Sequence, residues 1–234
     1  MYSIWVNTFA IVVGGLIGTL LRGGIPVRLR ETINVGVALC VLMIGISGAI
    51  KTENMMLVII CVVAGGALGE AIRIEAGLER LGEWAQRRFA RGDNTFAQGF
   101  VSATLLFCVG AMAVVGSLEA GLTGKGDTLM AKSMLDGVTA IIFASSMGPG
   151  VILSALPILV YQGSIALLSG SVGGYLSSEV INEMSAVGSV MIVGLGLNML
   201  GVMKERIRVG NMLPAMLLPI AYFPIYGWIA GLFN

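Results

Sequence analysis

The 234-residue chain contains no histidine and only three cysteines. Without histidine, a Ser-His-Asp triad, a His-ligated zinc site and a histidine proton relay are all excluded. Each cysteine stands alone inside an apolar run, so no CxxC motif or disulfide framework is predicted. We interpret the three as small packing residues: Cys40, Cys61 and Cys108.

Charge is also scarce. Asp, Glu, Lys and Arg make up 12% of the chain, about half of the share in soluble domains, while 56% is hydrophobic and the mean hydropathy is +0.93. This composition excludes a disordered chain, a nucleic-acid binder and an ordinary cytosolic enzyme. No nucleotide-binding loop is present, so ATP-driven transport by this chain alone is not expected, and no cofactor or metal is predicted.

What remains is the pattern of an all-α polytopic membrane protein whose main partner is the lipid bilayer. A transmembrane helix needs about 20 apolar residues. Eight segments qualify: Ser3–Leu21, Val35–Ile50, Met55–Ile72, Ala97–Ser117, Leu129–Met147, Val151–Val172, Ala186–Met203 and Asn211–Phe233. The second is short and is expected to continue from an interfacial helix.

The basic residues favour one orientation of these spans. Eleven of the fourteen follow spans one, three and seven, which places them on a single side if there are eight spans. By the positive-inside rule that side is the cytoplasm, so both termini are expected outside it, in a bacterial inner membrane. The first segment lacks a basic start and a cleavage pattern, so we interpret it as a mature helix. The turn 147–150 is critical to this orientation. If the segments on either side of it were re-entrant halves of one span, the count of spans would fall and would no longer agree with the positive-inside rule.

Between spans three and four, the segment Leu78–Ala90 has an apolar stripe on one helical face and arginines on the other side. Leu78, Leu81, Ala85 and Phe89 form the stripe, with Trp84 beside it. The pattern predicts an interfacial helix on the cytoplasmic face, at about residues 76–92. A solvated linker helix is the alternative.

The two ends of the chain resemble each other. A shift of 148 residues superimposes Gly15–Asn34 on Gly163–Asn182 and matches polar residues as well as apolar ones. We therefore predict one transmembrane domain, 1–234, with repeat one at about 1–72, central helices at 97–147 and repeat two at 151–233. The two repeats would run in opposite directions, and inverted repeats are common in secondary transporters. Convergent small-residue patterning is the alternative.

Span five carries Lys132 and Asp136, four residues apart on one helical face. Asp136 would lie roughly 10 Å deep at 1.5 Å per residue. A central Asp costs about 3 kcal/mol to insert and usually faces a partner or a water-filled cavity. Asp136 is therefore a candidate carrier of a proton or sodium ion. A buried ion pair that fixes the helix register is the alternative.

Other polar residues in the spans extend this candidate site. Hydroxyls, and the carbonyl that Pro157 frees, are ligands suited to a hard cation, although Ser and Thr also join membrane helices without binding anything. Asn7 and Asn198 are expected to face inward from equivalent halves. The predicted substrate- or ion-binding residues are Asp136, Lys132, Ser117, Thr139, Gln162, Ser154, Asn198 and Asn7.

Several glycines indicate places where a helix can break or where two helices can pack closely. The run Gly116–Gly124 permits either a helix break near a ligand or an outer loop with a glycine turn. Three small-xxx-small pairs are expected to be packing seams within one subunit or between two subunits of a homo-oligomer. They are Gly14/Gly18, Gly65/Gly69 and Gly170/Gly174.

Enzymatic interpretations fit poorly. Gly124–Asp127 spells the GxGD of intramembrane aspartic proteases, but those need carboxylates facing each other from separate helices, and Asp136 is only nine residues from Asp127. A Ser-Lys dyad would need a Ser at the head group of Lys132, and no spacing indicates one. We predict that the protein is not an enzyme.

Several motifs resemble the YqgA/YdfK family of uncharacterised bacterial inner-membrane proteins, over nearly the whole chain. They are Phe107–Gly110, Gly116-Ser117, Gly121–Gly124, Ala131–Asp136, Phe143-Ala144, Ser154-Ala155, Ser185–Gly188 and Asn211–Ala215. The resemblance implies a polytopic inner-membrane protein, often assumed to be a transporter, with no settled substrate. Members often carry Asp-Pro where this chain has Lys125-Gly126, so that loop is not expected to donate a carboxylate.

We therefore predict a secondary transporter of an unidentified small solute or ion, coupled to H⁺ or Na⁺ through Asp136. A non-transport membrane subunit or sensor that acts through helix contacts is the alternative, followed by a channel.

Overall fold

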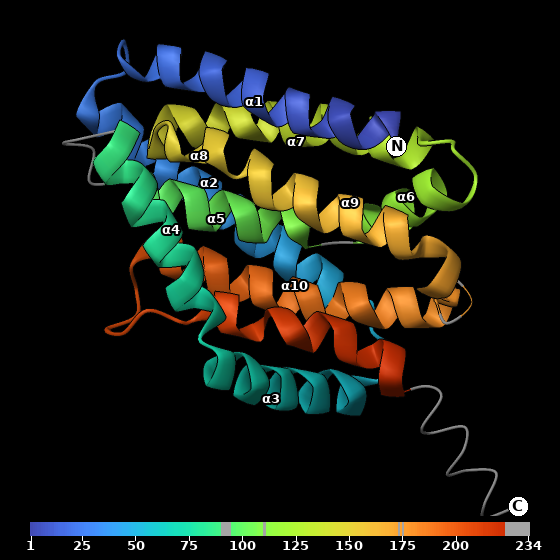
Figure 1. The fold of residues 1–234 in the computed structure, drawn as a ribbon. Coiled ribbons are helices and arrows are strands. Elements are labelled where there is room, and N and C mark those ends of the chain that lie inside the picture. Colours follow the sequence, from blue (N-terminus) through green and yellow to red (C-terminus); the bar gives the residue numbers. More distant parts are fainter. Residues whose placement is uncertain (90–94, 110, 173, 175, 223–234) are drawn as a thin grey trace, which may run out of the picture.

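In the computed structural model, which describes residues 1–89, 95–109, 111–172, 174 and 176–222, regular structure is helical throughout (Figure 1). The predicted all-α class is confirmed. The helices are α1 (Tyr2–Arg22), α2 (Val27–Ala49), α3 (Met55–Ile72), α4 (Ile74–Phe89), α5 (Phe96–Cys108), α6 (Ala111–Leu122), α7 (Asp127–Met147), α8 (Gly150–Leu153), α9 (Ala155–Val172), α10 (Ser178–Leu200) and the 3-10 helix η2 (Val209–Leu217).

Six helices of the described chain are long and apolar enough to cross a membrane. They are α1, α2, α3, α7, α10 and the continuous stretch Gly150–Ser171 formed by α8 and α9. The pair α5 and α6 adds a seventh if it counts as one span. The predicted eighth span, Asn211–Phe233, extends beyond the described residues, so a count of eight stays a prediction. The turn 147–150 joins two helices that are each long enough to span.

Two spans begin earlier in the structure than hydropathy indicates. α2 is one helix from Val27, and α10 begins at Ser178 rather than Ala186. Ser177 caps α10, because its hydroxyl accepts a hydrogen bond from the Val180 N–H at 3.3 Å. Gly201, with φ of +67°, ends the helix in the left-handed conformation that glycine tolerates best. Hydropathy detects only the apolar part of a helix, so it missed these polar first turns.

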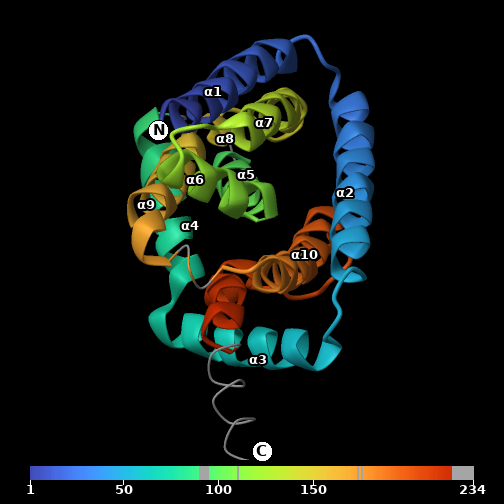
Figure 2. The same cartoon turned by 90° about the vertical axis from the view of Figure 1, so that its right-hand side faces the viewer.

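α5 lies inside the molecule. Figure 2 shows it within a ring formed by α1, α2, α3, α4 and α9. Ten of its thirteen residues are buried, and Phe100 and Phe107 belong to a core that also contains Ile11, Phe143 and Met191. The mostly apolar sequence of α5 is compatible with this central position.

The fourth predicted span is not one straight helix. α5 ends at Cys108, Val109 is extended, and α6 follows at an angle of 63° to α5. Of the two alternatives for Gly116–Gly124, the helix break is not observed, because α6 stays helical to Leu122, whereas Gly124, with φ of +72°, lies in the turn that follows. Gly116 and Gly121 instead allow close packing, since a Cβ there would meet Leu129 and the carbonyl oxygen of Ala166 respectively.

Two of the three glycine pairs are confirmed as packing seams within the subunit. A Cβ on Gly14 or Gly18 would overlap backbone carbonyls of α7, and a Cβ on Gly65 or Gly69 would overlap the backbone of η2. The third pair forms no seam within the subunit, because nothing lies within 4 Å of a Cβ on either residue, so a seam between two subunits stays a prediction. That pair is Gly170/Gly174.

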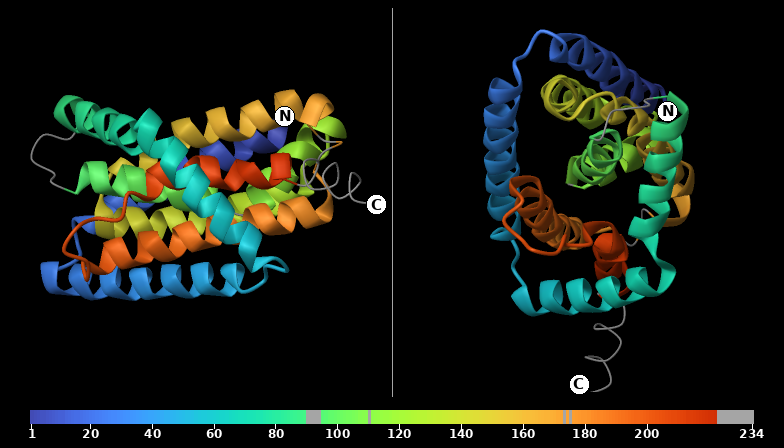
Figure 3. Two further views of the ribbon diagram at one scale, coloured as in Figure 1. Left: turned by 90° about the horizontal axis from the view of Figure 1, so that it is seen from below. Right: turned by 90° about the vertical axis from the view of Figure 1, so that its left-hand side faces the viewer.

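Helices far apart in sequence lie side by side. α2 packs along α10, α3 along η2, and α1 along both α7 and α9. The contacts of successive glycines show that α2 and α10 are antiparallel, as are α3 and η2, whereas α1 and α7 are parallel. α1 and α9 are antiparallel, as Figures 1 and 3 show. Each helix of the predicted first repeat thus packs against its counterpart in the second, although the repeat itself stays a prediction.

α4 crosses one end of the bundle rather than running along it (Figures 1 and 3). Gly82 and Ala85 face the protein, while Leu81 and Trp84, predicted on or beside the apolar stripe, are exposed. We call this end, where α1 and α3 end and α2, α5 and η2 begin, the arginine-rich end.

Candidate functional site

The Lys132–Asp136 pair lies on the inward face of α7. The Lys132 ammonium donates to both carboxylate oxygens of Asp136 at 2.7 Å, and each side chain is 8% exposed. The spacing of four residues brings the two groups together on one turn of helix. The pair is therefore closed and almost completely removed from solvent.

The pair is not arranged for the stability of an isolated helix. A basic residue preceding an acidic one by four positions is the less favourable order for the helix dipole. Burial of both charges also costs several kcal/mol per ion before their attraction is counted, so buried pairs are weak evidence of stabilisation. Stability alone therefore does not explain why the pair lies inside the bundle, and the side chains around it are relevant.

Two amide side chains from other helices complete the cluster. Asn7 of α1 donates to the Gln162 side-chain oxygen of α9 at 3.2 Å, and it also lies close enough to the Asp136 carboxylate to influence it. Asn7 and Gln162 are 0% exposed. Among the described residues, the Asn7 side-chain oxygen and the Gln162 side-chain nitrogen have no hydrogen-bond partner. We call Asn7, Lys132, Asp136 and Gln162 the buried polar centre.

Sequence reasoning missed two neighbours of this centre. Cys108, where α5 ends, lies within electrostatic range of both Lys132 and Asp136, and Tyr161 lies within range of Cys108. The helix break therefore lies beside the ion pair. Cys108 is buried, as its interpretation as a packing residue requires, but its apolar surroundings in the sequence gave no sign of this position.

Three hydroxyls near the middle of the bundle lack partners within the described part of the chain: Ser102, Thr104 and Tyr161. All three belong to α5 or α9. Buried hydroxyls normally pair with protein or with ordered water, so these three are candidates to contact a bound water or solute. Polar residues inside the apolar runs of these spans were the signal available in the sequence.

The other predicted residues do not join the centre. Ser117 and Ser154 each donate to a carbonyl of their own helix or turn at 2.6 Å, on Ala113 and Val151 respectively. Thr139 is half-buried, one turn beyond Asp136.

Asn198 also lies elsewhere. It hydrogen-bonds both backbone groups of Ile207 from the last turn of α10, whereas Asn7 lies in the second turn of α1. The expectation that the two Asn residues occupy equivalent positions was wrong, because Asn198 holds the segment that follows α10.

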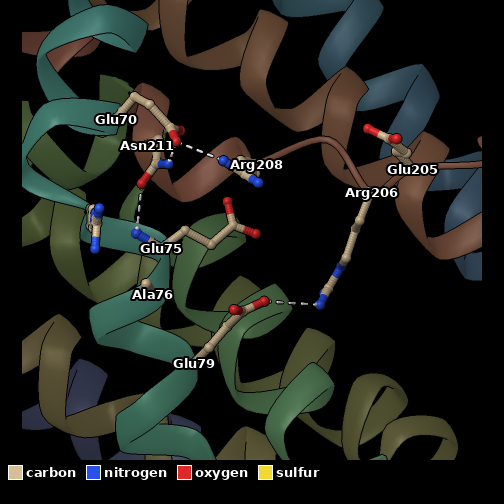
Figure 4. A pocket seen from close by; sticks show the side chains of 9 residues that line it. Glu70, Glu75, Ala76, Glu79, Glu205, Arg206, Arg208 and Asn211 are labelled. Carbon is tan, nitrogen blue, oxygen red and sulfur yellow. Dashed lines mark hydrogen bonds and ion pairs between the residues drawn. The ribbon is translucent and has the colours of Figure 1, made fainter.

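A second cluster forms a pocket of about 750 Å³ at the arginine-rich end (Figure 4). The α3–α4 corner faces the segment before η2. Asn211 connects them: its oxygen accepts from the Glu75 N–H at 2.8 Å, and its amide nitrogen donates to Glu70 at 2.6 Å. Arg208 binds Glu70 at 2.6 Å and Arg206 binds Glu79 at 3.5 Å. Most of these charges are thus used to hold two segments together.

Glu75 in this pocket has an unusual titration. It is 5% exposed, and burial raises its pKa, assisted by Glu79 and opposed by the Gly210 N–H, Arg206 and Arg208. The folded state therefore disfavours ionised Glu75. This cost is absent below the ordinary pKa of 4.5, grows as pH rises toward the folded pKa, and is complete above it.

We expect Glu75→Gln to be more stable than the wild type at about pH 8 and equally stable near pH 4. Gln still offers Gly210 an acceptor in place of the present 3.0 Å bond, but without charge. Thermal unfolding at both pH values measures the difference. Glu31→Gln is the control, because Glu31 is an exposed residue of α2 that does not line this pocket, and solvent screens its charge. A Glu75→Gln variant that is less stable at the higher pH would contradict the expectation.

Comparisons with known proteins agree on the class of molecule. A family model described as a protein of unknown function, DUF554, matches residues 2–223. The uncharacterised membrane protein YdfK of Bacillus subtilis (strain 168) is 30% identical over 97% of this chain and 98% of its own. The uncharacterised protein YqgA of Escherichia coli (strain K12) is 31% identical over 92% of each chain. No solved structure matches. The resemblance predicted from the motifs is confirmed.

Proposed function

The chain belongs to the DUF554 family of unknown function, and from that premise we propose that it is a secondary transporter. It would carry a small solute or ion across the bacterial inner membrane, with H⁺ or Na⁺ coupled through Asp136. We propose transport rather than catalysis, since the buried polar centre lies among membrane-spanning helices.

One observation carries the proposal. The buried pair of Lys132 and Asp136 is held between α1, α7 and α9, beside the break between α5 and α6. A broken span leaves backbone carbonyls and N–H groups without helical partners at its ends. Inside a membrane such backbone is tolerated only where protein or a water-filled cavity surrounds it. Discontinuous helices of this kind form the substrate and ion sites of many transporters.

The arrangement of the helices supports an inverted repeat. A two-fold axis in the membrane plane would make each helix of one repeat pack antiparallel to its counterpart, as α1 does with α9, α2 with α10 and α3 with η2. Transporters bind their substrate where two such repeats meet. We propose the repeat as this protein's architecture, with the segment from Val209 as the start of an eighth span.

The charge distribution supports an orientation. The arginine-rich end holds the basic loops and α4, so we propose that it faces the cytoplasm of a bacterial cell. The amino terminus then lies outside the cytoplasm, as does the carboxyl terminus if the eighth span is complete.

Currents from reconstituted protein test the proposal. Proteoliposomes on a solid-supported membrane are exposed to jumps of Na⁺, of pH and of a panel of amino acids, organic acids and metal ions. We expect one solute to give a current in the wild type and none in Asp136→Asn. Ser164→Ala is the control, because Ser164 is an exposed α9 residue that donates only to Val160 of its own helix. Its current should equal that of the wild type.

Binding to the same proteins supplies the second readout. A solute at a hundredfold its dissociation constant should stabilise the wild type by about 2.7 kcal/mol and leave Asp136→Asn unaffected. A folded wild type that shows neither stabilisation nor current with any solute would contradict a transport function. It would favour the alternative of a membrane subunit or sensor.

A further inference from the structure

The charges of the buried polar centre restrict what can bind there. Within the described chain, the ion pair with Lys132 is the one salt bridge that Asp136 makes, and the two charges sum to zero. A cation that took Lys132's place at Asp136 would leave a buried ammonium without its partner. An anion at Lys132 would leave a buried carboxylate. Either outcome costs several kcal/mol when the group is shielded from water.

A ligand that carries both charges avoids this cost. Its carboxylate replaces Asp136 at the Lys132 ammonium, and its own ammonium replaces Lys132 at the Asp136 carboxylate. The site therefore remains neutral when the pair opens, and each of the four charged groups keeps an opposite partner. A zwitterion is the ligand class whose charge matches both halves of the pair.

The unpaired amide atoms match the same ligand. The Asn7 side-chain oxygen, on a residue close to Asp136, is an acceptor without a partner in the described chain, and an ammonium has three N–H groups to donate. The Gln162 side-chain nitrogen is an unpaired donor, and a carboxylate only accepts. Both residues are 0% exposed, so a ligand can satisfy them where bulk water does not reach.

The packing beside the centre limits the size of the ligand. Gly137 directly follows Asp136, and its carbonyl oxygen lies where a Cβ on Gly14 would be. α1 and α7 thus touch backbone to backbone at the level of the pair. A ligand with a skeleton of two or three carbons suits this position better than one with a bulky side chain.

We propose that the buried polar centre binds a small zwitterion of amino-acid type, with its carboxylate on Lys132 and its ammonium on Asp136. The inference rests on the transport function proposed above and specifies the class of solute. It replaces the coupling of H⁺ or Na⁺ at Asp136, because the ammonium of the ligand occupies that carboxylate.

Matched triplets of probes test it. Glycine, acetate and methylammonium share one skeleton, as do alanine, propionate and ethylammonium, and each triplet differs only in charge. Melting temperature and proteoliposome current are measured for each probe with the full-length protein. We expect a zwitterion to bind the wild type at least about tenfold more tightly than its singly charged analogues.

Variants of the pair should change the preferred class. In Asp136→Asn the remaining ammonium should favour acetate or propionate, and in Lys132→Met the remaining carboxylate should favour the alkylammonium ions. Because either variant could fail to fold, Gln162→Leu is the second test. It keeps both charges and should weaken zwitterion binding about tenfold, through loss of one hydrogen bond to a charged group.

The outcomes separate this inference from the transport function. Stabilisation of the wild type by a singly charged probe, lost in Asp136→Asn, would overturn the zwitterion and leave transport standing. A current carried by another class of solute, with no current from either triplet, would likewise overturn the zwitterion and leave transport standing. Absence of current and stabilisation with every solute would overturn both.

Discussion

Asp136→Leu should lower the free energy of unfolding by about 3–5 kcal/mol, because Lys132 would keep its charge in a buried site without a partner. The present contact explains the size of the loss: both oxygens of Asp136 accept from Lys132 at 2.7 Å, with 8% of each side chain exposed. A denaturant titration of the purified protein in detergent measures this loss of free energy of unfolding. A variant as stable as the wild type would show that Lys132 finds another partner.

The double variant Lys132→Met/Asp136→Leu distinguishes structure from function. Apolar residues of similar volume in place of a buried ion pair are often neutral or stabilising by about 1–4 kcal/mol. We therefore expect the double variant to recover the stability that Asp136→Leu loses, and to carry no solute-dependent current. A double variant that still transports would assign the pair a purely structural role.

Gly18→Leu should be the second severe variant. A Cβ at residue 18 would already overlap the carbonyl oxygen of Ile141 and lie 2.9 Å from the Cβ of Ala144, so a full Leu side chain must push α1 away from α7. Overpacking of this kind typically costs about 1–3 kcal/mol, and a clash with backbone belongs at or above the upper end. Because Asn7 reaches Asp136 from α1, the same displacement should also weaken the buried polar centre.

Gly170→Leu is the matched control. Nothing lies within 4 Å of a Cβ at residue 170, and the residue is exposed on α9. We expect its free energy of unfolding to stay within about 0.5 kcal/mol of the wild type, as for most exposed positions. Equal effects of Gly18→Leu and Gly170→Leu in the same denaturant titration would mean that the α1–α7 seam does not determine stability.

The sequence predicted what local patterns determine. Hydropathy predicted the all-helical class, and a spacing of four residues put Lys132 and Asp136 on one face of a helix. The cost of charge in hydrocarbon then predicted that this face points inward. The position of a partner depends on tertiary packing, so Asn7 and Gln162 were named as candidates but their contact with each other was not foreseen.

Other features left no local signal. The break after Cys108 interrupts an apolar run, because a helix that is surrounded by protein needs no polar residue to end it. Ser117 and Ser154 were predicted as ligands from residue type alone, whereas the hydroxyls of Ser and Thr in helices often bind the preceding turn of their own backbone, as these two do.

The pairing of distant helices also determines when the protein can fold. α2 and α3 are complete once Ile72 has left the ribosome, but their main partners, α10 and η2, begin only at Ser178 and Val209. Until then both helices are inserted with lipid in place of protein, and the seam at Gly65 and Gly69 stays unfilled. Contacts of such long sequence separation form late and slowly. Assembly of these two helix pairs must therefore wait until most of the chain has been made, and a chain cut short before Ser178 would carry α2 and α3 without their main partners.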